Sequence, residues 1–296
     1  MTNNFQTYFN STENISYLSF NSMHTFFNML ITDVPIELGD QIFKKVFNEA
    51  RRLNTKLSKF DNDGLLSIIN EGAYSKLVEI DDEMIYILHD CFDMYLQTNK
   101  LFDISINSLT KIQDFYKKVE INEHLKTISL IDEHLKLDLG GYAKGYFLSV
   151  IKNILDNENV ENSLVNFGNS SIYARGKHPI GECWVVAVPD YFNREESVLK
   201  FELNDKFLTI SGRKYNQKEH IISPVTGKHI SNFDMACVVS ENPTQGEALT
   251  TAMIAAENNE VRHKLISCNK IPEAHYILYN PFGKIIENIE FSDHKI

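Results

Sequence analysis

The sequence of 296 residues contains few cysteines, the residue on which disulfide-rich and zinc-binding folds depend. Its four cysteines are Cys91, Cys183, Cys237 and Cys268, and none of them forms a CxxC pair. Zinc sites favour such closely spaced pairs, and small disulfide scaffolds need a much higher density of cysteine. We therefore expect free, buried thiols in a reducing compartment, without a zinc site or a disulfide framework.

Long apolar runs are also absent. No stretch reaches the ~18 apolar residues that a membrane-spanning helix needs. Residues 1–6 show no cationic region ahead of an apolar stretch, so no secretory signal is expected and the cytoplasm is the predicted location. Without repeats or linkers rich in proline and glycine, we expect a loosely ordered segment 1–15 and a single domain over 16–296. The length alone also permits two closely packed halves.

Positive charge is scarce, because 29 lysines and arginines stand against 40 acidic residues and give a net charge of -11. Binding to nucleic acid requires a basic face, so we do not expect a nucleic-acid partner. An anionic ligand would need a local cation or a metal. Aromatic residues are plentiful, with 19 phenylalanines and 13 tyrosines, which favours an aromatic core or a site that stacks a planar ligand.

Apolar spacing predicts helices over 36–58 and 82–98, a third from Gly141 through Ile154, and a fourth that begins at Thr244 as N-cap and runs to Ala256. Because helices do not alternate strictly with strands, the pattern favours an α+β fold over a doubly wound sheet. Strands are predicted at 23–30, 135–139, 163–167, 184–188, 207–210, 236–240 and 275–279, the last continuing through a turn at 280–283 into 284–286.

The segment Asp-Leu-Gly-Gly-Tyr-Ala-Lys-Gly at 138–145 is the first candidate for chemistry. Two glycines between a strand and a helix let the backbone approach a ligand, and the first N–H groups of the helix can face phosphate. Lys144 adds a cation one turn into the helix, and Asp138 can accept hydrogen bonds from a ligand. A glycine pair is a weak signal, so on these residues alone a tight turn without a ligand is the favoured interpretation.

Two later segments are further candidates. His220, in His-Ile-Ile-Ser-Pro-Val-Thr-Gly at 220–227, is either a general base near neutral pH or a structural histidine. Glu247 and Thr251 are four residues apart on the fourth predicted helix, so they share one face. Their oxygens suit Mg²⁺, although a glutamate in the first turn of a helix also interacts favourably with the helix dipole.

In their order, these segments resemble the FAD:protein FMN transferase (ApbE-like) family from about Phe20 to Ala256. Any single match is weak, but seven in the family's order are hard to obtain by chance. The matching segments are Leu-Ser-Lys-Phe-Asp at 57–61, Leu-Phe-Asp-Ile-Ser at 101–105, 138–145, Leu-Val-Asn-Phe-Gly at 164–168 with Ser-Ile-Tyr-Ala-Arg-Gly at 171–176, Ile-Ser-Gly at 210–212, 220–227, and Glu-Ala-Leu-Thr-Thr at 247–251.

The resemblance implies an α+β, T-fold-like architecture with mixed, largely antiparallel sheets flanked by helices. It also implies a Mg²⁺-dependent enzyme that cleaves the pyrophosphate of FAD, transfers FMN to a Thr or Ser hydroxyl of a target protein and releases AMP. Two alternatives stay open: a pyrophosphatase that converts FAD to FMN and AMP, and a divergent, non-catalytic FAD-binding protein.

Site residues follow from the same resemblance. The metal would bind the Gly141 carbonyl, Glu247 and Thr251. His220 would activate the acceptor hydroxyl, and Glu247 would be a catalytic residue as well as a metal ligand. FAD would contact Met23, Phe60, Leu101, Phe102, Asp103, Asp138, Lys144 and Ile221.

The chain departs from the family pattern at several of these motifs. Glu247 stands where the family has aspartate, and Ser223 replaces the aspartate of "HIIDP". His24 replaces the glycine of "MGT", and Ile-Asn-Ser-Leu at 106–109 replaces "VGPL". Because Mg²⁺ tolerates little deviation from octahedral geometry, the longer Glu247 side chain bears directly on metal binding.

Overall fold

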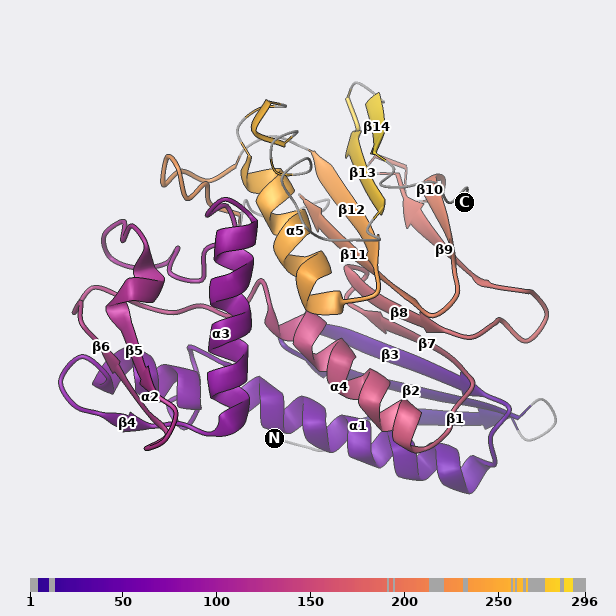
Figure 1. The fold of residues 1–296 in the computed structure, drawn as a ribbon. Helices are drawn as coiled ribbons and strands as arrows, with labels where there is room; N and C mark the ends of the chain where they lie inside the picture. Colours follow the sequence, from indigo (N-terminus) through magenta and orange to yellow (C-terminus); the bar gives the residue numbers. More distant parts are fainter. Residues whose placement is uncertain are drawn as a thin grey trace.

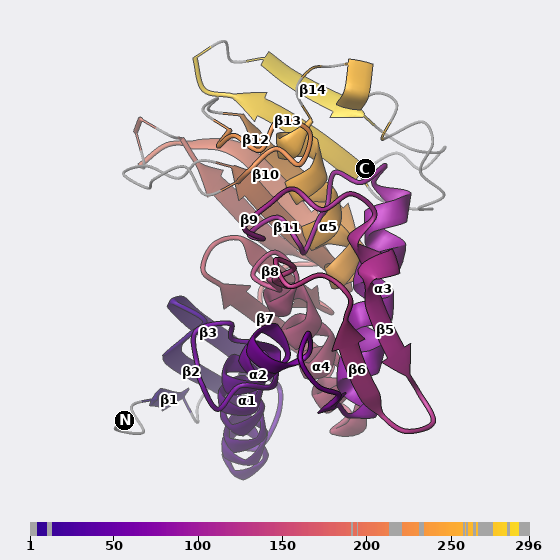
Figure 2. The ribbon, with the colours of Figure 1, turned by 90° about the vertical axis from the view of Figure 1, so that its left-hand side faces the viewer.

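A nine-stranded sheet forms the centre of the fold (Figure 1). The computed structural model describes residues 5–10, 14–190, 192–193, 195–212, 221–230, 234–256, 258, 260–262, 265, 275–282 and 285–289. Every neighbouring pair in this sheet is antiparallel, and Figure 2 shows the strands in one row from β1 to β14. Their order is β1 (Gln6–Asn10), β2 (Ile15–Ser22), β3 (Thr25–Thr32), β7 (Asn162–Phe167), β8 (Ser171–Arg175), β11 (Lys206–Gly212), β12 (Met235–Ser240), β13 (His275–Asn280) and β14 (Ile285–Ile289).

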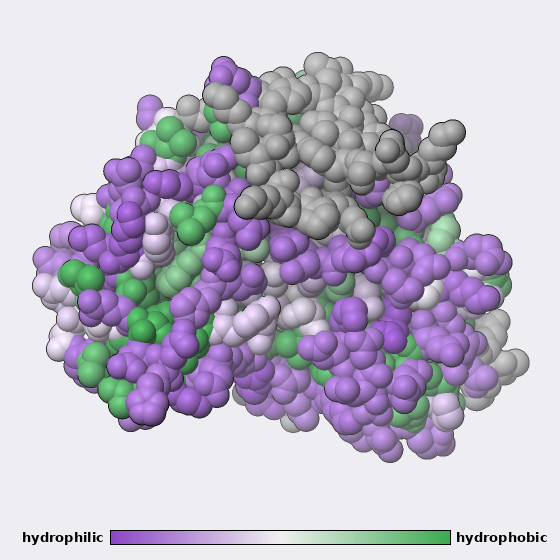
Figure 3. Space-filling view, viewed as in Figure 1, coloured by the Kyte–Doolittle hydropathy of each residue, from purple (hydrophilic) through white to green (hydrophobic). Residues whose placement is uncertain are grey.

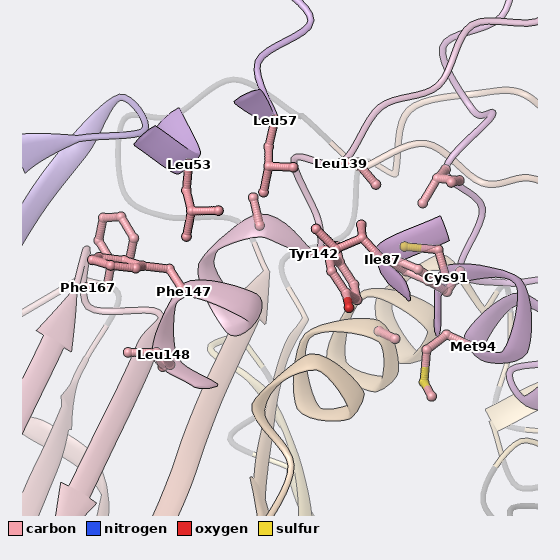
Figure 4. Close-up of a cluster of buried hydrophobic side chains, with 14 of the residues drawn as sticks. Leu53, Leu57, Ile87, Cys91, Met94, Leu139, Tyr142, Phe147, Leu148 and Phe167 are labelled. Carbon is pink, nitrogen blue, oxygen red and sulfur yellow. The ribbon is translucent and has the colours of Figure 1, made fainter. Parts of the chain in front are cut away.

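Helices α1 (Ile36–Lys56), α4 (Ala143–Asn157) and α5 (Pro243–Ala255) lie along one face of the sheet (Figure 1). Apolar residues recur every three or four positions in α1, and its inner side buries Ile42, Val46 and Leu53 completely. The main core lies between these helices and the sheet. Figure 4 shows part of that core, in which Phe147 of α4 packs beside Phe167 of β7.

A hairpin covers the opposite face of the sheet. Its strands, β9 (Trp184–Pro189) and β10 (Ser197–Leu203), pair antiparallel and bury Trp184 and Leu203 against β8, β11 and β12. The indole of Trp184 donates a hydrogen bond of 2.9 Å to the Arg175 carbonyl. This second core therefore contains the one tryptophan of the chain, with its polar atom satisfied.

A smaller unit stands beside the helical face. It contains α3 (Asp82–Gln97), α2 (Leu65–Gly72), a 3₁₀ turn at Phe115–Lys118 and a sheet of β4 (Val78–Glu79), β6 (Thr127–Leu130) and β5 (Val119–Asn122). On the face drawn in Figure 3, several apolar side chains gather over this part, while most of the surface is hydrophilic. The exposed apolar residues of this unit include Leu77, Tyr86, Leu96 and Leu125.

The α+β class and its largely antiparallel sheets are confirmed, whereas several local predictions were wrong. Gln6–Asn10 of the supposedly loose segment 1–15 pairs with β2 as β1. Residues 135–139 form no strand; their backbone is held by Asn70 and by the Ile104 carbonyl. Asn242, not Thr244, caps α5, because its side chain accepts from two backbone N–H groups. The single domain over 16–296 stays a prediction.

None of the helices in the described residues is both long and apolar enough to span a membrane.

Candidate active site

A cavity of about 380 Å³ opens where the starts of α4 and α5 meet two loops. This volume falls in the range of small-molecule sites. Its lining combines apolar and polar side chains from segments far apart in the sequence. It includes the predicted site residues Leu101, Phe102, Asp103, Asp138, Gly141, Lys144, Ile221, Glu247 and Thr251.

The turn at 138–145 forms one wall of the cavity. Leu139 and Tyr142, on either side of the two glycines, are fully buried and point into the core, which anchors the turn from beneath (Figure 4). The Leu139 carbonyl accepts from the backbone N–H groups of Tyr142 and Ala143 at 2.9 and 2.8 Å. The N–H groups of the N-cap Tyr142 and of Ala143, the first residue of α4, are therefore satisfied, although no side chain caps the helix.

Tyr142 connects this turn to two other helices. Its hydroxyl donates to Asp90 of α3 at 2.6 Å, and the Thr244 hydroxyl at the start of α5 lies 3.0 Å from the same carboxylate oxygen. Burial raises the pKa of the Tyr142 phenol, so it remains a donor to Asp90. One carboxylate thus ties together the starts of both helices that line the cavity.

Both carboxylate oxygens of Asp138 accept hydrogen bonds from other groups of the protein. One of its oxygens accepts from the Gly140 N–H at 2.8 Å, and the other accepts from Lys59 at 2.6 Å and from Asn107. Lys59 also lies 5.0 Å from the centre of the Phe60 ring. Asp138 therefore joins the 57–61 segment and the 106–109 segment at the cavity wall.

Glu247 of α5 lines the cavity beside this turn and is 3% exposed. Its carboxylate accepts from Lys144 at 2.9 and 3.1 Å and from the Ser171 hydroxyl. Thr251 follows one helical turn later, and its hydroxyl lies 3.8 Å from where a side chain on Gly141 would begin. The structure therefore brings the three predicted metal ligands, Gly141, Glu247 and Thr251, to one cavity.

The 101–107 segment supplies an apolar and an acidic part of the lining. The Phe102 ring packs against Gly141, where an added side chain would begin 3.4 Å from a ring carbon. Asp103 accepts from the backbone and hydroxyl of Ser105 at 2.7 and 2.6 Å. Burial raises the pKa of the Asp103 carboxyl, so the site contains one acid that is easier to protonate than usual.

Two predicted residues, Met23 and Phe60, do not line the cavity. His220 lies outside the described residues. Met23 occupies the two-residue turn between β2 and β3, not a strand, and its backbone N–H donates to Asn54 at 3.0 Å. Phe60 is 74% exposed, and it is the neighbouring Lys59 that contacts Asp138 in the cavity wall. The contacts of Met23 and Phe60 with FAD stay predictions, as does the role of His220 as a base.

The departures from the family pattern have local structural explanations. Met23 and His24 both have positive φ, the geometry of a two-residue hairpin turn that favours glycine, and histidine is among the other residues that adopt it more often than most. Ser223 is buried, and its hydroxyl lies 3.3 and 3.2 Å from the backbone N–H groups of Val225 and Thr226. It shapes the turn at 223–227 as an aspartate also would.

Sequence reasoning missed two groups, Lys59 and Ser171. Both belong to segments that match the family, but their side chains find partners far away in the chain, Asp138 and Glu247 respectively. No local spacing signals such pairs. The described residues also contain no cluster of three or more histidines, cysteines or acids able to hold a metal.

Comparison with known sequences gives consistent matches. The sequence model of the ApbE family matches residues 23–272. A protein of Vibrio cholerae serotype O1 named FAD:protein FMN transferase is 24% identical over 288 residues, covering 83% of this chain and 85% of that protein. A protein of the same name from Klebsiella pneumoniae strain 342 is 25% identical over 146 residues, covering 46% of this chain and 44% of that one.

Solved structures give the same result for the fold. A structure described as flavin transferase ApbE from Vibrio cholerae has a TM-score of 0.74 at 18% identity and covers 94% of this chain and 97% of its own. An ApbE protein from Thermotoga maritima has a TM-score of 0.78 at 20% identity, covering 96% and 97%.

Proposed function

Because the chain belongs to the ApbE family, we propose that it transfers FMN from FAD to a Thr or Ser hydroxyl of another protein and releases AMP. Two relatives with sequence similarity carry the name of this activity. The observation that carries the proposal is one cavity in which Lys144, Glu247 and Thr251 face the Gly141 turn. The cytoplasmic location stays a prediction.

The cavity lining divides into parts that suit a flavin dinucleotide. Leu101, Phe102 and Ile221 supply apolar surface for planar rings, and Asp103 supplies a polar group beside them. Lys144 lies next to Glu247, where its cation can meet phosphate. The lining therefore offers a cationic part for the pyrophosphate and an apolar part for the rings.

The donor set near Glu247 fits Mg²⁺. One carboxylate, one hydroxyl and one carbonyl are hard oxygen ligands, and the remaining positions suit water and substrate phosphates. The Thr251 hydroxyl has no hydrogen bond with any other described residue, so it is available as a ligand. When bound there, Mg²⁺ would neutralise charge on the pyrophosphate during its cleavage.

For this reaction the protein must mainly align the acceptor oxygen with the pyrophosphate, and it forms no covalent bond itself. The acceptor oxygen attacks the phosphorus of the FMN half, the bond to the AMP oxygen breaks, and the acceptor proton must leave. Lys144 and the Gly141 turn would hold the pyrophosphate in place, while His220 stays the predicted base. Without an acceptor, water in the same position would give FMN and AMP.

Removal of either side-chain ligand tests the proposal. We expect Glu247→Ala and Thr251→Ala to lower Mg²⁺-dependent AMP release from FAD about a hundredfold, because charge stabilisation in a closed site contributes that much. AMP is measured chromatographically, and covalent flavin on an added acceptor domain by fluorescence in denaturing gels. Glu241→Gln, which removes a surface carboxylate that is 61% exposed, is the matched control.

The outcomes separate the alternatives. Covalent flavin with AMP identifies a transferase, whereas FMN and AMP without flavin on the acceptor identify a pyrophosphatase. FAD binding with no AMP, unchanged in Glu247→Ala, identifies a non-catalytic binding protein. Full activity in both alanine variants would contradict the assignment of Glu247 and Thr251.

A further inference from the structure

Lys144 and Glu247 form a closed ion pair inside the proposed active site. The lysine ammonium lies 2.9 and 3.1 Å from the two carboxylate oxygens of Glu247 and 2.8 Å from the Ser171 hydroxyl. An ammonium has three N–H donors, and these contacts can use all of them. Side-chain exposure is 20% for Lys144 and 4% for Glu247, so water screens the pair weakly.

The packing of the two helices brings Lys144 close to Glu247. At Gly145, a side chain would begin 2.6 Å from the Pro243 carbonyl oxygen and 2.8 Å from Cγ of Glu247. The backbone of α4 therefore touches the stem of Glu247 directly beside Lys144. The close approach of the helices therefore places the Lys144 and Glu247 side chains next to each other.

The Glu247 carboxylate cannot fully neutralise both Lys144 and a divalent cation. It is the single carboxylate among the three residues proposed to hold the metal, and the described chain offers no acidic cluster to share the charge. A divalent ion in contact with Glu247 would lie within a few ångströms of the Lys144 ammonium, and two like charges at that distance repel strongly in a poorly hydrated site. A divalent ion can therefore bind Glu247 only if the Lys144 ammonium moves away.

We propose that Lys144 is the resident counter-ion of Glu247 and that a divalent cation binds by displacing it. The proposal rests on the metal dependence proposed above. The flexible stem of Lys144 lets its ammonium turn into the cavity that it already lines, toward the place of the pyrophosphate. Metal binding would then do two things: occupy Glu247 and release a cation to the substrate.

The test is a titration of the protein with MgCl₂ in the absence of FAD, at constant ionic strength, followed by calorimetry. We expect Lys144→Met to lower the dissociation constant for Mg²⁺ about tenfold, because the competing charge is gone. Lys144→Arg keeps the charge and should bind Mg²⁺ within about twofold of the original chain. Lys152→Met removes a lysine from the same helix that is 44% exposed and should have no effect.

Thermal unfolding separates this role from a purely structural ion pair. Lys144→Met leaves a buried carboxylate without its cation, so its Tm should fall, and Mg²⁺ should restore it. Unchanged or weaker Mg²⁺ binding in Lys144→Met, when the original chain binds the ion, would overturn the counter-ion role alone. Absence of Mg²⁺ binding in both proteins would overturn the metal site as well.

Discussion

Gly145 sets how closely α4 approaches α5. The ideal position of a side-chain carbon there lies 2.6 Å from the backbone oxygen of Pro243, a separation that real side chains do not adopt. Glycine in a helix normally costs about 1 kcal/mol relative to alanine. Its presence in the first turn of α4 is therefore explained by contact between two backbones, and that contact places Lys144 beside Glu247.

Gly145→Ala should lower the free energy of unfolding by about 1–3 kcal/mol, because the clash outweighs the gain in helix propensity. Urea unfolding measures the change. Gly181→Ala is the matched control, since its nearest neighbours would lie 3.7 and 3.8 Å away, an ordinary contact distance. Unfolding free energies that are equal for the two variants would mean that α4 and α5 can separate without cost.

At this scale, the sequence allowed the prediction of residues whose motifs lie within a few positions of one another. Glu247 and Thr251 share a helix face by spacing, and Gly141 and Lys144 share a turn, so each pair was identified locally. The pairing of Lys144 with Glu247 joins positions 103 residues apart, and no periodicity encodes it. The prediction placed Lys144 on phosphate because of its position in the turn, which gives no indication of its contact with Glu247.

At the scale of elements, an ion cluster joins α1 to α3. Arg52 of α1 holds Glu83 of α3 with two hydrogen bonds of 2.5 and 2.7 Å, and Lys56 contacts the same carboxylate. Tyr146 of α4 donates to it at 3.0 Å. The hydrogen bond from Arg52, helped by Lys56, lowers the pKa of Glu83 from its ordinary 4.5 to about 2.

This shift predicts a dependence of stability on pH. A carboxyl whose pKa is lower in the folded state stabilises the fold above its ordinary pKa, and that contribution disappears as pH falls from about 4.5 toward about 2. Glu83→Gln should therefore have a lower Tm than the original chain at pH 7, and the gap should narrow by pH 3. Glu79→Gln, an exposed carboxylate on β4, is the control.

A gap between Glu83→Gln and the original chain that stays constant from pH 7 to pH 3 would show that Glu83 acts through packing and not through its charge.

The same scale shows which elements a sequence specifies. Helices α1 and α3 end within two residues of their predicted ends, because long amphipathic periodicity is a strong signal. Residues 135–139 alternate like a strand but have no strand beside them, and the Asn70 side chain takes both backbone hydrogen bonds of Leu137 instead. Strand β1 was missed since its pairing with β2, not its composition, makes it a strand.

At the scale of the whole molecule, the cavity exists only because distant parts of the chain close around it. Its walls come from 101–107, 138–144, 210–212, 221–224 and 247–251, which the central sheet and its helices bring together. The family resemblance predicted this assembly, whereas composition and periodicity could not, because neither gives the order of strands in a sheet. Binding of a ligand across these walls should therefore stabilise the entire fold.

FAD in the presence of EDTA should raise the Tm of the chain in proportion to the logarithm of its concentration. A ligand at a hundred times its dissociation constant adds about 2.7 kcal/mol, which corresponds to several degrees for a protein of this size. Asn107→Trp should abolish this rise, because Asn107 lines the cavity at its exposed edge. Leu109→Trp, in the same loop and 77% exposed but outside the lining, should leave it intact. If both tryptophan variants respond to FAD as the original chain does, the dinucleotide binds elsewhere, and the cavity between α4 and α5 loses its role.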